Sequence, residues 1–215
     1  MKFDRILCDV PCSGDGTFRK NLQLWRTFHS HMGHGNHALQ LDILERGFKL
    51  LKKGGRIVYS TCSFNPLEDE AVVAAALARH LKQVKIVDVS QELSPFLRYR
   101  PGLTSWKVLH RGKGKKAGPM WYQNFKDVPD WQKKLVKETM FTSTYTDFNN
   151  DEVRHGKPEL HDDPLGLKHC MRFYPHDDNQ GGFFVAVMEK IYDEDEGIVH
   201  DDTYTMDAWT NSKVR

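Results

Sequence analysis

Cysteines are few in this sequence, long apolar runs are absent and the net charge is small. The 215 residues include four cysteines, and no two of them form a CxxC pair. Four scattered cysteines are too few for a disulfide framework and lack the spacing of a structural zinc site. No apolar run approaches the roughly 20 residues needed to cross a bilayer. We therefore expect free thiols, no bound metal and no membrane partner.

A secretory signal is also lacking at the start of the chain. The first residues, MKFDRILCDVPC, contain no long apolar stretch and no small-residue cleavage site, which predicts an intracellular protein. Lysine and arginine number 31 against 29 aspartates and glutamates, so the net charge of +2 indicates no class of partner. The charge is uneven, with a basic cluster at 107–116 and an acidic run at 193–196. We predict that the acidic tail, residues 192–215, is disordered.

Strand-like and helical segments alternate along the first 90 residues. Three apolar runs predict buried strands, at residues 3–10, 56–60 and 84–89. Between the first two runs, apolar residues at helical spacing predict a helix that ends at Gly54. Between the second and third, Asn65 as an N-cap and Glu68 in a capping box predict a helix from residue 66 to about 81.

This order is typical of an open α/β sheet wound with parallel strands, in which ligands bind beyond the carboxyl ends of the strands. Residues 101–165 are loop-rich by comparison, and residues 171–191 read as two strands joined by a polar turn, a hairpin that closes the sheet. The histidine- and glycine-rich residues 29–37 are predicted to form a solvated connecting loop rather than a metal site, because no fixed ligand geometry is evident.

A glycine-rich turn follows the first strand, in CDVPCSGDGTFRK. A phosphate-binding P-loop needs Gly-x4-Gly-Lys-Ser/Thr, but Gly16 is followed by Thr17, Phe18 and Arg19, so the lysine is missing. A cysteine phosphatase loop places an arginine six positions after its cysteine, and the step from Cys12 to Arg19 is one residue too long. The first interpretation is excluded and the second is weak.

Two cysteines follow neighbouring strands of the predicted sheet. Cys12 follows the first strand and Cys62 the second, so their thiols are expected to converge on one ligand at the sheet edge. Two such thiols suit methylation of a pyrimidine at carbon 5, because one thiolate adds to carbon 6 and the other assists release of the product. Asp9 ends the first strand, where its carboxylate can form a hydrogen bond with the pyrimidine or contact the methyl donor. Cys8 and Cys170 are predicted to be core residues.

Long segments around these cysteines carry a family resemblance. DRILCDVPCSGDGTFRKN and LLKKGGRIVYSTCSFNPLEDEAVV closely resemble the two cysteine motifs of the RNA (cytosine-5) methyltransferases of the Sun/Fmu type, and RFYPHDDNQGGFFVAV resembles their closing strands. PGLTSWKV and VPDWQKKLVKETMF look most like eukaryotic members that act on tRNA. The resemblance implies a class I methyltransferase fold, S-adenosylmethionine as cofactor and tRNA as the RNA partner. It also implies a location in the nucleus, specifically in the nucleolus.

The resemblance also implies roles for individual residues. Cys62 in the Thr-Cys motif is the nucleophile, and Cys12 in the Pro-Cys motif aids product release. Asp9 matches a position that lines the pocket for S-adenosylmethionine and cytosine. Arg19 and Lys20, directly after the Cys12 loop, are expected to contact the RNA backbone. An unperturbed thiol has a pKa of about 8.5, so Cys62 needs a polar or cationic environment to become a thiolate.

In that family, a glycine-rich loop that precedes the strand matching residues 3–10 holds most of the methyl donor. We therefore expect the chain to be the carboxyl-terminal part of a methyltransferase catalytic domain, residues 1–191 with an insertion at about 101–165, and to bind S-adenosylmethionine poorly alone. The first strand would then have an open apolar edge that invites pairing with another chain. The alternative function is a catalytically inactive RNA-binding fragment or regulator.

Overall fold

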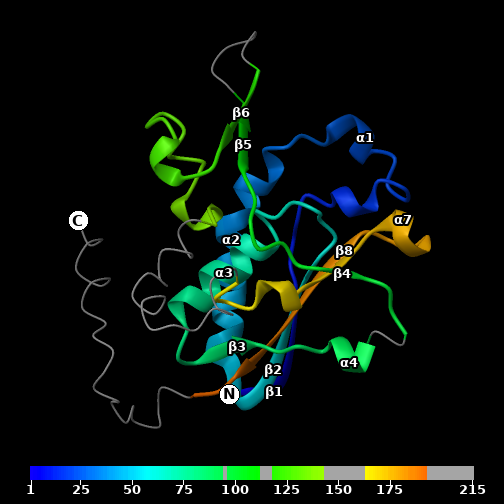
Figure 1. Ribbon diagram of the computed structural model, residues 1–215, viewed down its shortest axis with the longest axis vertical. Helices are drawn as coiled ribbons and strands as arrows, with labels where there is room; N and C mark the ends of the chain where they lie inside the picture. Colours follow the sequence, from blue (N-terminus) through cyan, green and yellow to red (C-terminus); the bar gives the residue numbers. More distant parts are fainter. Residues whose placement is uncertain (94–95, 112–117, 143–162, 193–215) are drawn as a thin grey trace.

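The computed structural model describes residues 1–93, 96–111, 118–142 and 163–192. One twisted sheet runs through it (Figure 1), in the order β1-β2-β8-β7-β4, with β3 also pairing with β8. Its strands are β1 (Phe3–Asp9), β2 (Leu51–Thr61), β3 (Val84–Ile86), β4 (Arg100–Pro101), β7 (Met171–Phe173) and β8 (Phe183–Lys190). The predicted tail, apart from Tyr192, and residues 112–116 of the basic cluster lie outside the described residues.

The sheet is mixed, and this confirms the α/β class while correcting the strand directions. β1 and β2 are parallel, as predicted, with Cys8 opposite Tyr59. β8 then lies antiparallel beside β2, and β3 is antiparallel to β8. The third strand therefore does not extend a parallel sheet, because β8 occupies the position next to β2. The closing pair β7 and β8 is antiparallel, as predicted, and the short helix α7 (Pro175–Asp178) connects them.

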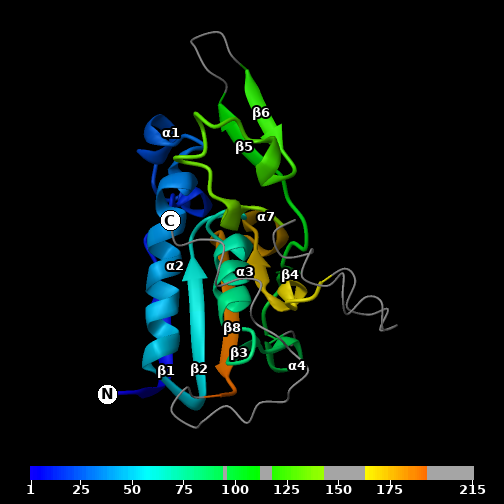
Figure 2. The same ribbon diagram turned by 90° about the vertical axis from the view of Figure 1, so that its left-hand side faces the viewer.

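Two helices pack side by side against the sheet, α2 (Met32–Leu50) and α3 (Glu70–Arg79), as Figure 2 shows. Their apolar faces and the strands form the main core. Its fully buried members include Leu44, Ile57, Tyr59, Phe184 and Met188. Cys8 and Cys170 are buried too, which confirms that both are core residues. None of the helices in the described ranges is long and apolar enough to cross a membrane.

The start of α2 corrects the prediction of a solvated loop at residues 29–37. The helix begins at Met32, and His34 and His37 are buried within it. His37 Nδ1 lies 2.6 Å from the backbone oxygen of Leu67, and its Nε2 lies 2.9 Å from Thr139 Oγ1. These tertiary contacts outweigh the low helix propensity of the glycines here, which is why the sequence pattern was misleading.

Helix boundaries near the two cysteine motifs also differ from the prediction. α2 ends at Leu50 and β2 begins at once, so Gly54, with a φ of 71°, lies inside an irregular part of β2 rather than at a helix end. α3 begins at Glu70, not at residue 66, with Asp69 as its N-cap. Residues 66–69 form turns instead, in which Leu67 N donates to Asn65 Oδ1 at 3.1 Å. Glu68 is therefore outside the helix, and its side chain is used elsewhere.

The region predicted to be loop-rich contains a small second sheet. β5 (Val108–Arg111) and β6 (Pro119–Tyr122) are antiparallel and form a hairpin that projects at the top of Figure 1. Trp106 is buried and donates from Nε1 to the Met140 backbone oxygen at 2.8 Å, so it is a core residue. Trp121 and Trp131 are exposed.

The outer edge of β1 is open in the described part of the chain. β1 pairs with β2 on one side only, and Leu7 is 70% exposed. Unpaired backbone groups beside an exposed leucine are suited to strand addition. Pairing of this edge with another chain stays a prediction.

We predict that Leu44→Ala lowers the free energy of unfolding by about 2–5 kcal/mol, because it leaves a cavity in the core between α2 and the sheet. Leu39→Ala in the same helix is the matched control, since Leu39 is 51% exposed and should change stability by about 0.5 kcal/mol or less. Urea unfolding followed by circular dichroism measures both. Equal losses in the two variants would contradict the packing described.

Candidate active site

One cavity contains all five residues singled out from the sequence. It has a volume of about 960 Å³ and lies at the carboxyl ends of β1 and β2, where the segment between α7 and β8 forms the opposite wall. Its lining includes Asp9, Cys12, Arg19, Lys20 and Cys62. Arg19 and Cys62 are far apart in the sequence. The turn after β1 folds back over the end of β2 and brings them together.

The two cysteine thiols meet at this cavity. Cys12 Sγ and Cys62 Sγ are 3.4 Å apart, within hydrogen-bond distance for sulfur, and both side chains are partly exposed. The parallel pairing of β1 and β2 accounts for this, because it ends both strands at the same level, with Asp9 opposite Ser60. The expected convergence of the thiols is thus observed, whereas their roles in a reaction stay predictions.

The thiol contact makes the two cysteines chemically unequal. A hydrogen bond from Cys12 lowers the pKa of Cys62 to about 7, although burial and the Asp9 carboxylate act against this. The same hydrogen bond, together with burial, raises the pKa of Cys12. Lys20 also helps to lower the pKa of Cys62 through its positive charge. Of the two sulfurs, Cys62 is therefore the one that loses its proton more readily near neutral pH.

Asp9 and Arg19 lie beside the thiols and are held by different hydrogen bonds. Asp9 is exposed and accepts a hydrogen bond from Ser60 Oγ at 2.9 Å. Arg19 donates from Nη2 to Asn179 Oδ1 at 2.7 Å, across the cavity mouth. Asn179 has a φ of 50° and is the only residue other than glycine with positive φ in the described ranges. A left-handed residue at the end of α7 turns the chain back toward the first cysteine loop.

Two glycines of the turn after β1 have separate functions. Gly14 has a φ of 73°, a conformation that favours glycine. Gly16 is needed for close approach instead, because a Cβ there would lie 2.7 Å from the Gly182 oxygen and 2.8 Å from the Cys62 oxygen. Gly16 N donates to Cys62 O at 2.9 Å, and Gly182 N donates to Gly16 O at 3.0 Å. Gly16 therefore joins three loops of the site through backbone hydrogen bonds.

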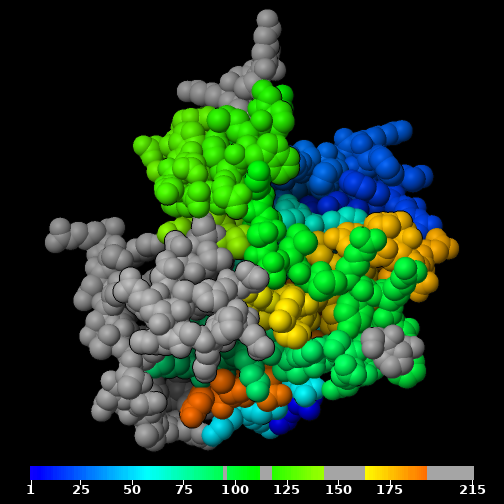
Figure 3. Space-filling model, in the orientation of Figure 1, coloured from blue at the N-terminus to red at the C-terminus, as the bar shows by residue number. Residues whose placement is uncertain are grey.

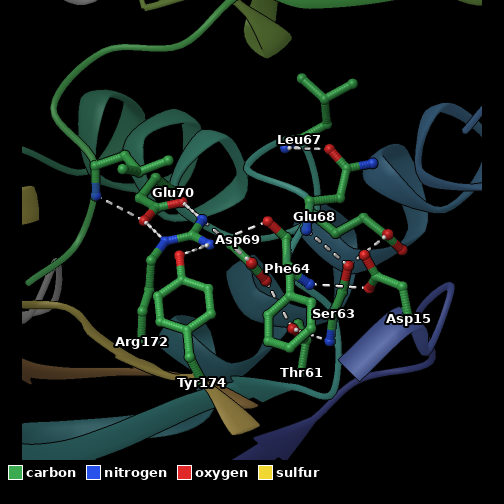
Figure 4. Close-up of polar contacts among 12 residues, drawn as sticks. Asp15, Thr61, Ser63, Phe64, Leu67, Glu68, Asp69, Glu70, Arg172 and Tyr174 are labelled. Carbon is green, nitrogen blue, oxygen red and sulfur yellow. Dashed lines mark hydrogen bonds and ion pairs between the residues drawn. The ribbon is translucent and has the colours of Figure 1, made fainter. Parts of the chain in front are cut away.

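Glu68 connects the two cysteine loops, and Figure 4 shows it beside Ser63 of the second loop. It is fully buried, and Ser13 N donates to its Oε1 at 2.8 Å. The hydroxyls of Ser13 and Ser63 both donate to its Oε2. From α2, Asn36 and Gln40 donate to Oε1 at 2.9 and 3.2 Å. Because Ser13 and Ser63 directly follow Cys12 and Cys62, one side chain fixes the relative position of both cysteines.

The next two acidic residues hold the base of the second cysteine loop. Asp69 accepts from Thr61 Oγ1 at 2.6 Å, and burial raises the pKa of Asp69 well above its ordinary value. Glu70 forms a two-point ion pair with Arg172, which comes from β7 and is almost fully buried. Arg172 also donates from Nη1 to the Phe64 oxygen at 3.0 Å. Figure 4 shows this arginine reaching from β7 across to the start of α3.

The sequence pattern does not reveal the roles of these buried residues. It predicts Glu68 in a helix cap and indicates no role for Asp69, Glu70 or Arg172. A signal was present, because three acidic residues precede the apolar run AVVAAALA, which must be buried. Acidic groups drawn into a core need partners. The sequence could not show which distant residue supplies each partner.

The cavity offers one carboxylate and some aromatic surface to a cofactor. Asp9 is the single carboxylate among the cavity residues, and Phe173 and Phe183 add aromatic surface. These residues fit the cationic end of a methyl donor such as S-adenosylmethionine. No group of three or more histidine, cysteine or acidic side chains in the described ranges could hold a metal ion.

Comparisons with known proteins identify relatives. Residues 1–101 match the family model described as 16S rRNA methyltransferase RsmB/F. A multisite-specific tRNA:(cytosine-C(5))-methyltransferase of Schizosaccharomyces pombe is 48% identical over 190 residues, which are 88% of this chain and 24% of that protein. The enzyme of the same description from Saccharomyces cerevisiae is 41% identical over 91% of this chain and 25% of its own length. The chain thus spans about a quarter of the length of these relatives.

Other similarities are more distant or of the fold only. A tRNA (cytosine(34)-C(5))-methyltransferase of Drosophila melanogaster is 39% identical over 88% of this chain and 23% of its own length. Among solved structures, a methyltransferase homolog from Pyrococcus horikoshii has a TM-score of 0.48 at 23% identity and covers 88% of this chain and 40% of its own. The structure described as NSun6 from the same organism with SFG has a TM-score of 0.47 at 20% identity, covering 90% and 31%.

We predict that alkylation of Cys62 by iodoacetamide increases with pH through a midpoint near 7, because the hydrogen bond from Cys12 favours the thiolate. Cys12→Ala should move that midpoint upward, since the donor is lost, whereas Cys12→Ser keeps a hydroxyl donor and should move it less. Mass spectrometry of the Cys62 peptide measures the rate. An unchanged midpoint in Cys12→Ala would show that the two sulfurs are not coupled.

We also predict that Glu68→Gln lowers the free energy of unfolding by about 1–3 kcal/mol, because an amide nitrogen cannot accept the hydrogen bonds that the lost oxygen received. The Cys62 alkylation midpoint should rise in the same variant, since the Cys12 loop loses its anchor. Glu45→Gln is the control, because Glu45 pairs with the partly exposed Arg79 and its loss should cost about 1 kcal/mol or less. A Glu68→Gln protein with unchanged stability and midpoint would contradict the anchoring role.

Proposed function

We propose that this chain belongs to the RNA cytosine-C5-methyltransferase family and contributes the catalytic cysteines for methylation of carbon 5 of cytosine in RNA, with tRNA as the substrate. The chain covers about a quarter of the tRNA-methylating relatives, so the activity of the whole protein is part of the proposal. The observation that carries it is the pair of unequal thiols, 3.4 Å apart, at one cavity.

The lower pKa makes Cys62 the nucleophile. Its thiolate forms a carbon–sulfur bond to carbon 6 of the cytosine, and the electron pair of the bond between carbons 5 and 6 makes carbon 5 nucleophilic. S-adenosylmethionine, as the proposed methyl donor, supplies an electrophilic methyl group when bound. Asp9 faces the same cavity, where its carboxylate can accept a hydrogen bond from the cytosine amine or attract the cationic donor.

Release of the product returns Cys62 to its thiolate form. A base takes the proton at carbon 5, the two ring carbons regain their double bond, and the bond from carbon 6 to Cys62 breaks. Cys12 keeps its proton because its pKa is raised. It lies 3.4 Å from the departing sulfur and can stabilise it by donating a hydrogen bond. This accounts for the presence of the second cysteine.

Positive side chains at the cavity support an RNA substrate over a free nucleoside. Arg19 and Lys20 lie beside the thiols, where backbone phosphates of a polynucleotide would pass. A flipped-out cytosine could then enter the cavity while its neighbours stay outside. The nuclear location expected from the resemblance stays a proposal, and imaging of a fluorescent fusion would check it.

We predict that the protein forms an adduct with RNA containing 5-azacytidine, stable to denaturing gel electrophoresis, through a bond from Cys62 to carbon 6. Cys62→Ser should abolish the adduct, and Cys12→Ala should keep it, because 5-azacytosine has no carbon-5 proton and its methylated adduct cannot be released with or without Cys12. Cys8→Ala is the control for loss of a cysteine outside the cavity and should behave as the unchanged protein. An adduct that persists in Cys62→Ser would refute the assignment, and RNA binding without any adduct would favour the inactive RNA-binding alternative.

A further inference from the structure

Next to the cavity, the segment after the first cysteine loop exposes apolar side chains among cations. Leu22 is 73% exposed and Trp25 is 68% exposed, on and just before α1 (Leu24–Thr27). Arg19, Lys20 and Arg26 belong to the same short segment and are also exposed. We call these five residues the basic-aromatic ledge. Neither the fold nor the cysteine chemistry explains why a tryptophan is exposed to solvent here.

The tryptophan is held rigidly despite its exposure. Trp25 Nε1 donates to the Phe18 backbone oxygen at 3.1 Å. Its ring stacks on Phe18 with centroids 5.0 Å apart and planes 28° from parallel, and Phe28 packs edge-on against Phe18 at 5.1 Å. One face of the indole is therefore covered by the Phe18 ring, and the other face is exposed to solvent. A planar ring could stack on that side with little loss of side-chain freedom.

The ledge borders the reactive sulfur. At Gly14, an added Cβ would lie 3.6 Å from Leu24 Cδ1 and 3.9 Å from Cys62 Sγ, so α1 and the thiol flank the same glycine. Arg19 and Lys20 belong to both the ledge and the cavity lining. In Figure 3, the blue surface of this segment lies against the orange surface around α7, in agreement with the Arg19–Asn179 hydrogen bond.

The charge of the ledge has one sign. No aspartate or glutamate occurs between Asp15 and Asp42, and Asp15 accepts from Phe64 N at 2.9 Å, at the second cysteine loop. No carboxylate of the described ranges forms an ion pair with Arg19, Lys20 or Arg26. A partner for this surface must combine negative charge with flat apolar rings, which is the chemistry of unpaired RNA.

We propose that the basic-aromatic ledge binds single-stranded RNA next to the target cytosine, with a neighbouring base stacked on Trp25 and phosphates beside Lys20 and Arg26. This rests on the proposed function, since it assumes that the base at Cys62 is part of an RNA chain. A protein partner fits less well, because two apolar side chains in a segment with three cations offer little area for a packed interface.

The test measures binding of a fluorescein-labelled single-stranded RNA with one cytosine, by anisotropy at fixed salt, using the full chain. Trp25→Ala should weaken binding roughly 5- to 100-fold, the usual effect of losing one stacking aromatic, and Trp25→Phe should restore most of it. Phe96→Ala is the matched control, since Phe96 is 82% exposed but follows α4 (Ser90–Leu93), which lies near the bottom of Figures 1 and 2 whereas α1 lies near the top. It should bind as the unchanged protein.

Charge and stacking can be separated in the same assay. Arg26→Gln should reduce the slope of the logarithm of the binding constant against the logarithm of the salt concentration by about one. Trp25→Ala should leave that slope unchanged. RNA should also quench tryptophan fluorescence in the unchanged protein and much less in Trp25→Ala. Equal affinity of Trp25→Ala and the unchanged protein would overturn the proposal, and so would an equal loss with Phe96→Ala.

The outcomes distinguish this proposal from the proposed function. If the Cys62 adduct forms but Trp25→Ala binds RNA normally, the ledge is not the RNA site while the methylation chemistry stands. If binding depends on Trp25 but no adduct forms, the ledge proposal stands and the methylation proposal fails. A loss of duplex RNA binding as large as that of single strands would also count against stacking on Trp25, because paired bases cannot reach it.

Discussion

Three consecutive acidic side chains, Glu68, Asp69 and Glu70, are fully buried before and at the start of α3, and the site is arranged around the hydrogen bonds they accept. Burying one such group without partners costs several kcal/mol, so each must be matched. Glu68 is matched by both cysteine loops and by α2, Asp69 by Thr61, and Glu70 by Arg172 from β7. Segments more than one hundred residues apart in sequence are thereby held at one point.

This arrangement explains how two thiols can lie in contact at the cavity. A contact of 3.4 Å between sulfurs on two loops requires both loops to be fixed. Glu68 fixes them through Ser13 and Ser63, and Gly16 fixes them through backbone hydrogen bonds. The shared hydrogen bond then lowers the pKa of Cys62 and raises that of Cys12. The difference in pKa between the two thiols thus arises from position, since the two side chains are chemically identical.

Around the thiols, the surface is divided between two kinds of contact. The cavity contains Asp9 and the two sulfurs, which are the groups proposed to act on a single base, whereas the basic-aromatic ledge exposes the cations and Trp25 that are proposed to bind the RNA chain. Arg19 belongs to both and donates a hydrogen bond to Asn179 on the opposite wall.

The sequence by itself determined the α/β class, the strands β1 and β2 and the convergence of Cys12 with Cys62, because apolar runs and the ends of parallel strands are local features with a fixed geometric meaning. It did not determine that β8 lies between β2 and β3, that α2 begins at Met32, or that Glu68 leaves the helix to join two loops. Those outcomes depend on partners far along the chain, such as Thr139 for His37 and Arg172 for Glu70. Only the tertiary structure decided them, because a buried polar group is stabilised by whichever distant donor the fold brings within hydrogen-bond distance.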